Sequence, residues 1–112
     1  MVIMPDADKQ RTVENLVGAS VGAAGQRCMA ISVAIFVGKS KEWIQDVKQE
    51  MEKVKPGPWD SPESGYGPLI SKTAKERVLS LIETGKSEAI CLLDRSEERR
   101  VGKERRSRWT PY

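Results

Sequence analysis

Residues 31–37 form a nearly unbroken run of apolar residues, most of them β-branched, that ends at Gly38. Such a run is typical of a parallel strand that is covered on both faces. A strand of this kind needs helices on either side of its sheet. This one feature therefore restricts the chain to the α/β class.

The patterns on either side of this run alternate between strand and helix. In chain order we predict a strand over residues 2–4, a helix capped by Asp6 and ended by Gly25, the strand over 31–37, a helix capped by Ser40 and stopped by Pro56, a helix capped by Ser71 and ended by Gly85, and a strand over 89–93. Apolar residues at helical spacing are expected to face inward: Val13, Leu16, Val17, Ser20, Val21, Ala24, Trp43, Ile44, Val47, Met51, Val54, Ala74, Val78, Leu81 and Ile82. The expected fold is an incomplete, mostly parallel sheet with flanking helices.

Charge divides the chain near Asp94. The 112 residues carry 19 Lys and Arg against 16 Asp and Glu, a net charge of +3. Residues 1–94 hold 12 basic and 13 acidic side chains, whereas residues 95–112 hold 7 and 3. The last segment is thus basic and has a single aliphatic residue, Val101, so we expect it to be disordered.

Composition excludes several functional classes. No apolar run reaches the roughly 20 residues of a membrane-spanning helix, so no membrane partner is expected. The chain has no histidine and two cysteines, which rules out an ordinary zinc site and a disulfide framework. We therefore expect neither a metal nor a metal-dependent activity.

The one group of residues that could carry out a reaction is a cysteine that follows a glycine-rich turn. Cys28 lies after Gly22 and Gly25 and before the predicted buried strand. The adjacent Arg27 would favour the nucleophilic thiolate, and the Cys28 N–H could donate to an oxyanion. The alternative is a buried structural cysteine beside a helix end, a common location for free cysteine. Cys91, inside an apolar pattern, is expected to lie in the core.

The motif Gly25-Gln26-Arg27-Cys28 is similar to the Gly-Gln-x-Cys active-site motif of the aldehyde dehydrogenase superfamily. Further blocks resemble the same family in the same order, over residues 2–8, 67–70, 74–78, 82–85 and 92–94. The resemblance covers residues 2–94 without a large gap. It indicates a piece of an aldehyde dehydrogenase catalytic domain, from a CoA-acylating subfamily.

This resemblance implies a specific chemistry and setting. The Cys28 thiolate would attack the carbonyl of a semialdehyde, NAD would accept hydride, and coenzyme A would resolve the thioester while the substrate loses its carboxylate. Arg27 would recognise that carboxylate, with stabilisation of the thiolate as the competing role. The subfamily also implies valine and pyrimidine breakdown, a homotetramer, and a mitochondrial location in eukaryotes or a cytoplasmic one in bacteria.

Three parts of the family's catalytic apparatus fall outside this stretch. The Rossmann-like nicotinamide domain and the oxyanion asparagine lie upstream, and the Glu-x-Phe-Gly-Pro block lies downstream. The fragment by itself is therefore expected to be inactive and without a cofactor-binding residue.

Residues 95–112 have a resemblance of their own. They are similar to the translation of a sequencing-library adapter, and they depart from it at Arg105 and Thr110. We expect this segment to be an artefact of assembly rather than part of the dehydrogenase.

Two other functions are compatible with parts of the sequence. The basic tail, with Trp109 and Tyr112, could bind phosphates, but Glu97, Glu98 and Glu104 dilute its charge and no recognition module accompanies it. A thiol redox role has less support because there is no Cys-x-x-Cys pair. We therefore expect no nucleic-acid partner.

Overall fold

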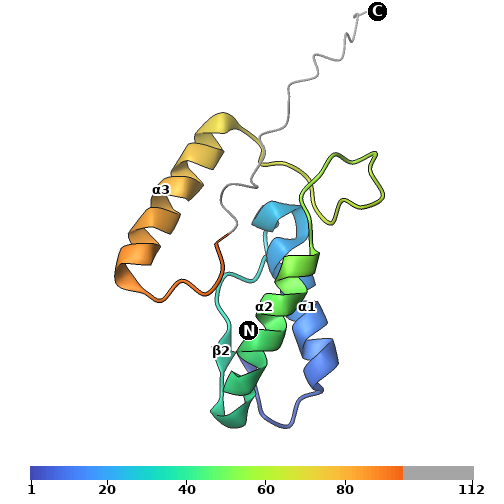
Figure 1. Ribbon diagram of the computed structural model, residues 1–112, viewed down its shortest axis with the longest axis vertical. Coiled ribbons are helices and arrows are strands. Elements are labelled where there is room, and N and C mark those ends of the chain that lie inside the picture. The colour runs from blue at the N-terminus through green and yellow to red at the C-terminus, as the bar shows by residue number, and fades with distance from the viewer. Residues whose placement is uncertain (95–112) are drawn as a thin grey trace, which may run out of the picture.

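The computed structural model describes residues 1–94, and the predictions for the tail lie outside this range (Figure 1). Its elements are β1 (Val2–Ile3), α1 (Lys9–Val21), the 3₁₀ turn η1 (Gly22–Gly25), β2 (Ile35–Phe36), the 3₁₀ turn η2 (Gly38–Trp43), α2 (Ile44–Lys53) and α3 (Lys72–Glu88). Helices accompany a two-stranded parallel sheet, which confirms the predicted α/β class.

The two strands pair in parallel through the crossover formed by α1. Val2 lies opposite Ile35 and Ile3 opposite Phe36. The Ile35 N–H donates to the Met1 carbonyl at 2.8 Å, and the Val37 N–H donates to the Ile3 carbonyl at 2.9 Å. Because parallel strands require a crossover, this pairing places α1 against the sheet.

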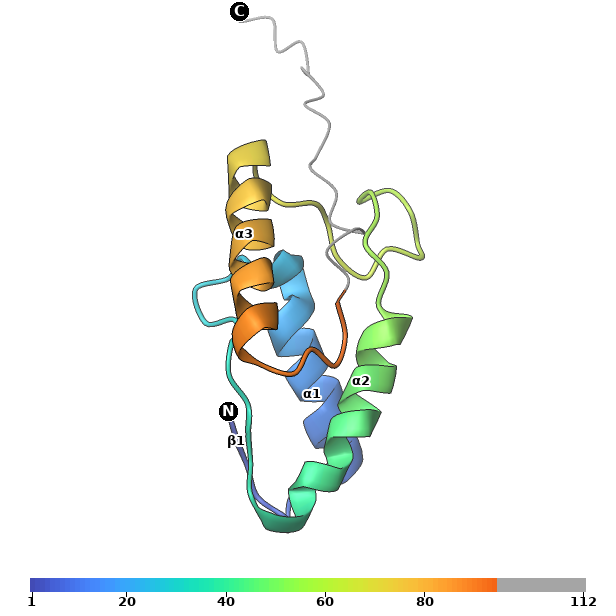
Figure 2. The same ribbon diagram turned by 60° about the vertical axis from the view of Figure 1, so that its left-hand side comes forward.

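The core lies where α1 packs between the strand pair and α2. Its buried apolar residues are Ile3, Val13, Leu16, Val17 and Leu69. Figures 1 and 2 both show α1 and α2 side by side. Of the stripe predicted for the first helix, the first three residues are buried and Ser20, Val21 and Ala24 are half-buried.

Both predicted caps of the first two helices are wrong. Asp8 rather than Asp6 caps α1, since the Arg11 N–H donates to Asp8 Oδ1 at 2.9 Å. Ser40 lies fully buried inside η2, with its Oγ 3.0 Å from the Ile3 carbonyl and 2.9 Å from the Val37 carbonyl. Its hydroxyl is thereby turned toward β1 and β2, and α2 begins only at Ile44.

The end of the first helix also differs from the prediction. The α-helix ends at Val21, and the chain continues through η1, where Ala23 and Ala24 have φ of 52° and 56°. Gly25, at φ +77°, follows as predicted for a residue that stops a helix. The left-handed backbone thus starts two residues earlier than the glycine.

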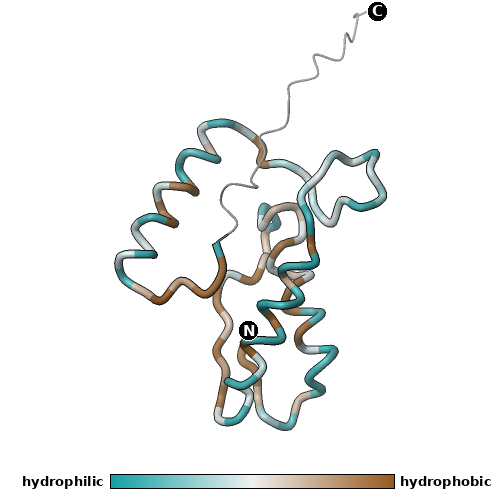
Figure 3. The backbone as a smooth tube through the Cα atoms, viewed as in Figure 1, coloured by the Kyte–Doolittle hydropathy of each residue, from teal (hydrophilic) through white to brown (hydrophobic). Residues whose placement is uncertain are grey.

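The run over residues 31–37 is paired only at β2, and the predicted burial on both faces is wrong. Val33 is 64 % exposed and Ile35 is 54 % exposed. A strand is covered only where neighbouring strands and helices exist, and within residues 1–94 β2 has one neighbouring strand. Figure 3 shows this apolar segment as a brown stretch of the tube.

Helix α3 stands to one side of the α1–α2 pair in Figure 1. Its predicted cap is confirmed, because the Ala74 N–H donates to Ser71 Oγ at 3.1 Å. Its predicted burial and end are wrong: no residue of α3 is buried, Leu81 is 60 % exposed, and the helix passes Gly85 to end at Glu88.

The segment after α3 forms no strand, contrary to the prediction for residues 89–93. Ile90 is 89 % exposed, and Cys91 is exposed rather than in the core. Lys86 holds this segment by pairing with Asp94 at 2.6 Å and with Glu83 at 2.8 Å. The hydrogen bond to Asp94, then that to Glu83, raises the pKa of Lys86.

Candidate active site

Cys28 lies on an exposed turn between η1 and the segment that leads to β2. The turn is closed by the Ala30 N–H, which donates to the Arg27 carbonyl at 3.2 Å. The Ile31 N–H then donates to the Ala19 carbonyl at 3.1 Å, which returns the chain to α1. Residues 22–31, here named the cysteine loop, are thus attached at both ends to the packed helix α1.

The cysteine has the features that a nucleophile needs. Its side chain is exposed, and within residues 1–94 its backbone N–H has no hydrogen-bond partner. An unpaired N–H beside the sulfur can donate to an oxyanion formed when the thiolate attacks a carbonyl. Burial, on which the structural alternative depended, is not observed here. The assignment of Cys28 as the nucleophile stays a prediction.

Arg27 folds back over the end of α1. A Cβ added at Gly22 would lie 2.8 Å from Arg27 Nη1 and 2.9 Å from its Cζ, so the guanidinium occupies the space that a side chain at this position would fill. None of the ion pairs among the described residues includes Arg27. Its guanidinium is therefore without an ion-pair partner among the described residues.

Gln26 has a role that sequence reasoning missed. Its Nε2 donates to the Ala23 carbonyl at 2.9 Å and to the Pro68 carbonyl at 3.4 Å. Its Oε1 accepts from the Ile70 N–H at 2.9 Å. These last two partners lie more than 40 residues away in sequence, a distance that no local pattern reveals. Only the joint resemblance of residues 25–28 and 67–70 to one family pointed to both segments.

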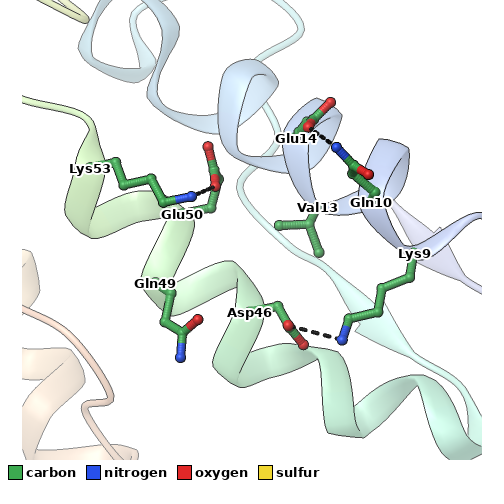
Figure 4. A pocket seen from close by; sticks show the side chains of 8 residues that line it. All are labelled: Lys9, Gln10, Val13, Glu14, Asp46, Gln49, Glu50 and Lys53. Carbon is green, nitrogen blue, oxygen red and sulfur yellow. Dashed lines mark hydrogen bonds and ion pairs between the residues drawn. The ribbon is translucent and has the colours of Figure 1, made fainter.

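A surface groove of about 360 Å³ between α1 and α2 lies away from this site (Figure 4). It is lined by Lys9, Gln10, Val13, Glu14, Asp46, Gln49, Glu50 and Lys53. Lys9 pairs with Asp46 at 2.9 Å, and the hydrogen bond to Glu50 raises the pKa of Lys53. None of these residues belongs to the cysteine loop, so the groove is no part of the candidate active site.

No group of three or more Cys, Asp and Glu side chains is arranged to hold a metal ion within residues 1–94. None of the helices in the same range is both long and apolar enough to cross a membrane.

The aldehyde dehydrogenase family model matches residues 1–109. An α/β segment that carries an exposed cysteine after a glycine turn agrees with this match. The chain belongs to the aldehyde dehydrogenase family.

Two curated relatives within the family have the same enzyme name. The chain is 48 % identical over 92 residues to the bovine (Bos taurus) mitochondrial methylmalonate-semialdehyde/malonate-semialdehyde dehydrogenase [acylating], a match to 82 % of this chain and 17 % of the relative. The probable enzyme of the same name from Dictyostelium discoideum is 47 % identical over 93 residues, covering 82 % of this chain and 18 % of its own length. The chain thus spans less than a fifth of these relatives.

Solved structures agree with the sequence relatives. Methylmalonate-semialdehyde dehydrogenase from Oceanimonas doudoroffii superposes with a TM-score of 0.78 at 34 % identity, over 83 % of this chain and 20 % of that one. A putative methylmalonate-semialdehyde dehydrogenase from Sinorhizobium meliloti, complexed with NAD, gives 0.74 at 41 % identity, over 80 % and 18 %. The fold of this chain is therefore that of one part of an aldehyde dehydrogenase.

Proposed function

We propose that residues 1–94 are part of the catalytic domain of a longer, NAD-dependent, CoA-acylating methylmalonate/malonate-semialdehyde dehydrogenase, with Cys28 as its nucleophile. The names of the relatives, at 46–48 % identity, support the substrate class and the acylating reaction. The observation that carries the proposal is Cys28 itself, an exposed thiol on a turn whose own N–H is unpaired within the described residues.

The chemistry starts at the Cys28 sulfur. The thiolate forms a bond to the aldehyde carbon, the carbonyl π electrons move to oxygen, and the Cys28 N–H donates to the resulting oxyanion. NAD, when bound, supplies the two-electron acceptor for the hydride that leaves this carbon, and no described residue is assigned to hold it. The product on the protein is a thioester between Cys28 and the oxidised substrate. Coenzyme A, when bound, would supply the thiol that takes the acyl group from Cys28, so that the Cys28 thiolate is restored and the proton of that thiol is released.

Arg27 is proposed to bind the carboxylate of the semialdehyde. A guanidinium can form two parallel hydrogen bonds with a carboxylate, which orients the substrate as well as binding it. This substrate is expected to lose that carboxylate as CO₂: the electron pair of the broken C–C bond stays on the carbon next to the thioester carbonyl, and that carbon takes up a proton. The competing role, stabilisation of the Cys28 thiolate, predicts that Arg27 variants affect aldehydes with and without a carboxylate equally.

The test is NADH formation by the full-length enzyme with semialdehyde, NAD and coenzyme A. We expect Cys28→Ser to lower the rate about a thousandfold or more, because the alcohol is a far weaker nucleophile than a thiolate. The matched control is Cys91→Ser, which changes the other exposed cysteine and should retain the activity. Full activity in Cys28→Ser would refute the proposal.

The setting of the enzyme is part of the same proposal. We propose a homotetramer of valine and pyrimidine breakdown, located in mitochondria if the source is eukaryotic and in the cytoplasm if it is bacterial. The curated eukaryotic relatives are named as mitochondrial. The 112-residue chain by itself should form no NADH, because most of the length of these relatives is missing from it.

Residues 95–112 are proposed to be translated adapter sequence. The family model extends to residue 109, beyond the proposed boundary at Asp94. Reads of the transcript across codon 94 separate these alternatives. Reads that continue into a family-like sequence support the proposal, whereas reads that run through Tyr112 to a stop codon would refute it.

A further inference from the structure

Gln26 joins the cysteine loop to residues 67–70. Its amide donates to the Ala23 carbonyl and to the Pro68 carbonyl, and it accepts from the Ile70 N–H. A side-chain amide can donate through its NH₂ group and accept through its oxygen at once. Gln26 uses both its donor and its acceptor in this structure.

The two segments that Gln26 joins are not equivalent. Residues 67–70 are anchored, because Leu69, between the two partner residues, is 4 % exposed and belongs to the core. The cysteine loop is strained, since Ala23 and Ala24 adopt left-handed backbone that non-glycine residues rarely occupy. Gln26 therefore links residues 67–70, which the core holds in place, to the strained backbone of the cysteine loop.

The Ala23 carbonyl receives two hydrogen bonds from the same residue. The Gln26 backbone N–H donates to it at 3.0 Å, and Gln26 Nε2 donates to it at 2.9 Å. These bonds fix the strained peptide and the orientation of Gln26 together. Cys28 lies two residues further along the same loop. We therefore expect the position of Gln26 to determine where the Cys28 sulfur and N–H lie.

We propose that Gln26 is a positioning residue that holds the Cys28 sulfur and N–H in place for attack on the aldehyde. This inference rests on the proposed function, because it assigns a role toward Cys28 as the nucleophile. Displacement of a reacting group by about 1 Å can lower a rate by about 100-fold. The role should therefore appear in kcat rather than in substrate binding.

The experiment compares variants of the full-length enzyme. We expect Gln26→Ala to lower kcat about 10- to 100-fold while KM changes less than about threefold. Gln26→Glu keeps the acceptor for the Ile70 N–H and loses the two donors, so it should recover part of the lost kcat. Gln10→Ala is the matched control, since Gln10 donates to Glu14 within α1 and should retain the wild-type kcat.

A second readout does not depend on activity. The peptide that contains Ile70 should exchange its amide hydrogen faster in Gln26→Ala, because that N–H loses its acceptor, and its exchange should be unchanged in Gln10→Ala. Faster exchange with an unchanged kcat would overturn the positioning role. The positioning role would also be overturned if the fall in kcat of Gln26→Ala matched its loss of folded enzyme and were equally large in Gln26→Glu. If Cys28→Ser retains full activity, the proposed function fails instead, whatever the Gln26 variants do.

Discussion

Residues 1–54 and residues 71–94 have similar sequence patterns but very different burial. In the first region, α1 packs on α2, and Leu16 is 4 % exposed. In the second, α3 has an equally regular apolar stripe, yet Leu81 is 60 % exposed. An amphipathic pattern thus predicts a helix, but it buries a face only where the same chain supplies a partner.

Exposed apolar residues indicate surfaces that lie against other parts of a larger protein. Exposed large apolar residues occur in both regions and between them: Met1, Val2, Met4, Met29, Val33, Ile35, Trp59, Ile70, Leu81, Ile90 and Leu92. The relatives are more than five times as long as the matched region. We expect the missing length to cover these surfaces in the full enzyme.

The largest expected contrast comes from leucine truncations in the two regions. In the 112-residue chain, Leu16→Ala should reduce the free energy of unfolding by about 2–5 kcal/mol because it leaves a cavity in the core. Leu81→Ala should change it by less than about 0.5 kcal/mol. Urea denaturation followed by circular dichroism measures both. Equal losses of unfolding free energy in the two variants would contradict the difference in packing between the two regions.

Gly22→Ala tests the site within the packed region. The new Cβ would overlap the Arg27 guanidinium and displace it, while the φ of Gly22, −52°, suits alanine. In the full-length enzyme we expect KM for the semialdehyde to rise about tenfold, equivalent to about 1.4 kcal/mol. KM for an aldehyde without a carboxylate should stay the same. An equal rise for both substrates would contradict carboxylate binding by Arg27.

The side chains that cap α1 and α3 provide a second test of the difference between the two regions. Asp8→Ala and Ser71→Ala each remove one side-chain acceptor at a helix start, at a cost of about 1 kcal/mol. The first should lower the stability of the whole packed region, since α1 carries most of its core. The second should speed hydrogen exchange in α3 alone. Faster exchange in α1 after Ser71→Ala would show that the regions unfold together.

The smallest expected effect concerns Lys86. Asp94 and Glu83 raise the pKa of Lys86 in the folded chain. The contribution of Lys86 to folding stability is therefore fully present below the unfolded pKa of about 10.4, and it is lost as pH rises through the higher folded pKa. The helix content of wild type should exceed that of Lys86→Met at pH 9, and the two should converge at higher pH. Lys72→Met, at a long 3.8 Å pair with Glu76, is the control. A difference that persists at high pH would contradict this assignment.

The sequence predicted most of the architecture and part of the site. The order of helices, the parallel pairing and the cap at Ser71 follow from local patterns, and these patterns are present in the chain. The predicted strand over 89–93 and the inward face of α3 failed because their partners are not among residues 1–94. Ser40 was misread as a cap because its hydroxyl turns to a carbonyl of β1, 37 residues away.

The same limit applies at the site. The sequence displays the glycine turn before Cys28, but it left open whether the cysteine is buried or, as in the structure, exposed. The bridge from Gln26 to Ile70 depends on how two distant segments pack. Long-range hydrogen bonds of this kind require coordinates, since neither partner has a pattern that points to the other.

The central claim, that Cys28 is the nucleophile of a semialdehyde dehydrogenase, has one most direct measurement. The full-length enzyme is incubated with semialdehyde and NAD in the absence of coenzyme A, quenched in acid and digested for peptide mass spectrometry. Our account predicts an acyl thioester on the peptide that contains Cys28, which disappears when coenzyme A is added. NADH formation with the acyl group on another residue, or with no acyl-enzyme at all, would contradict it.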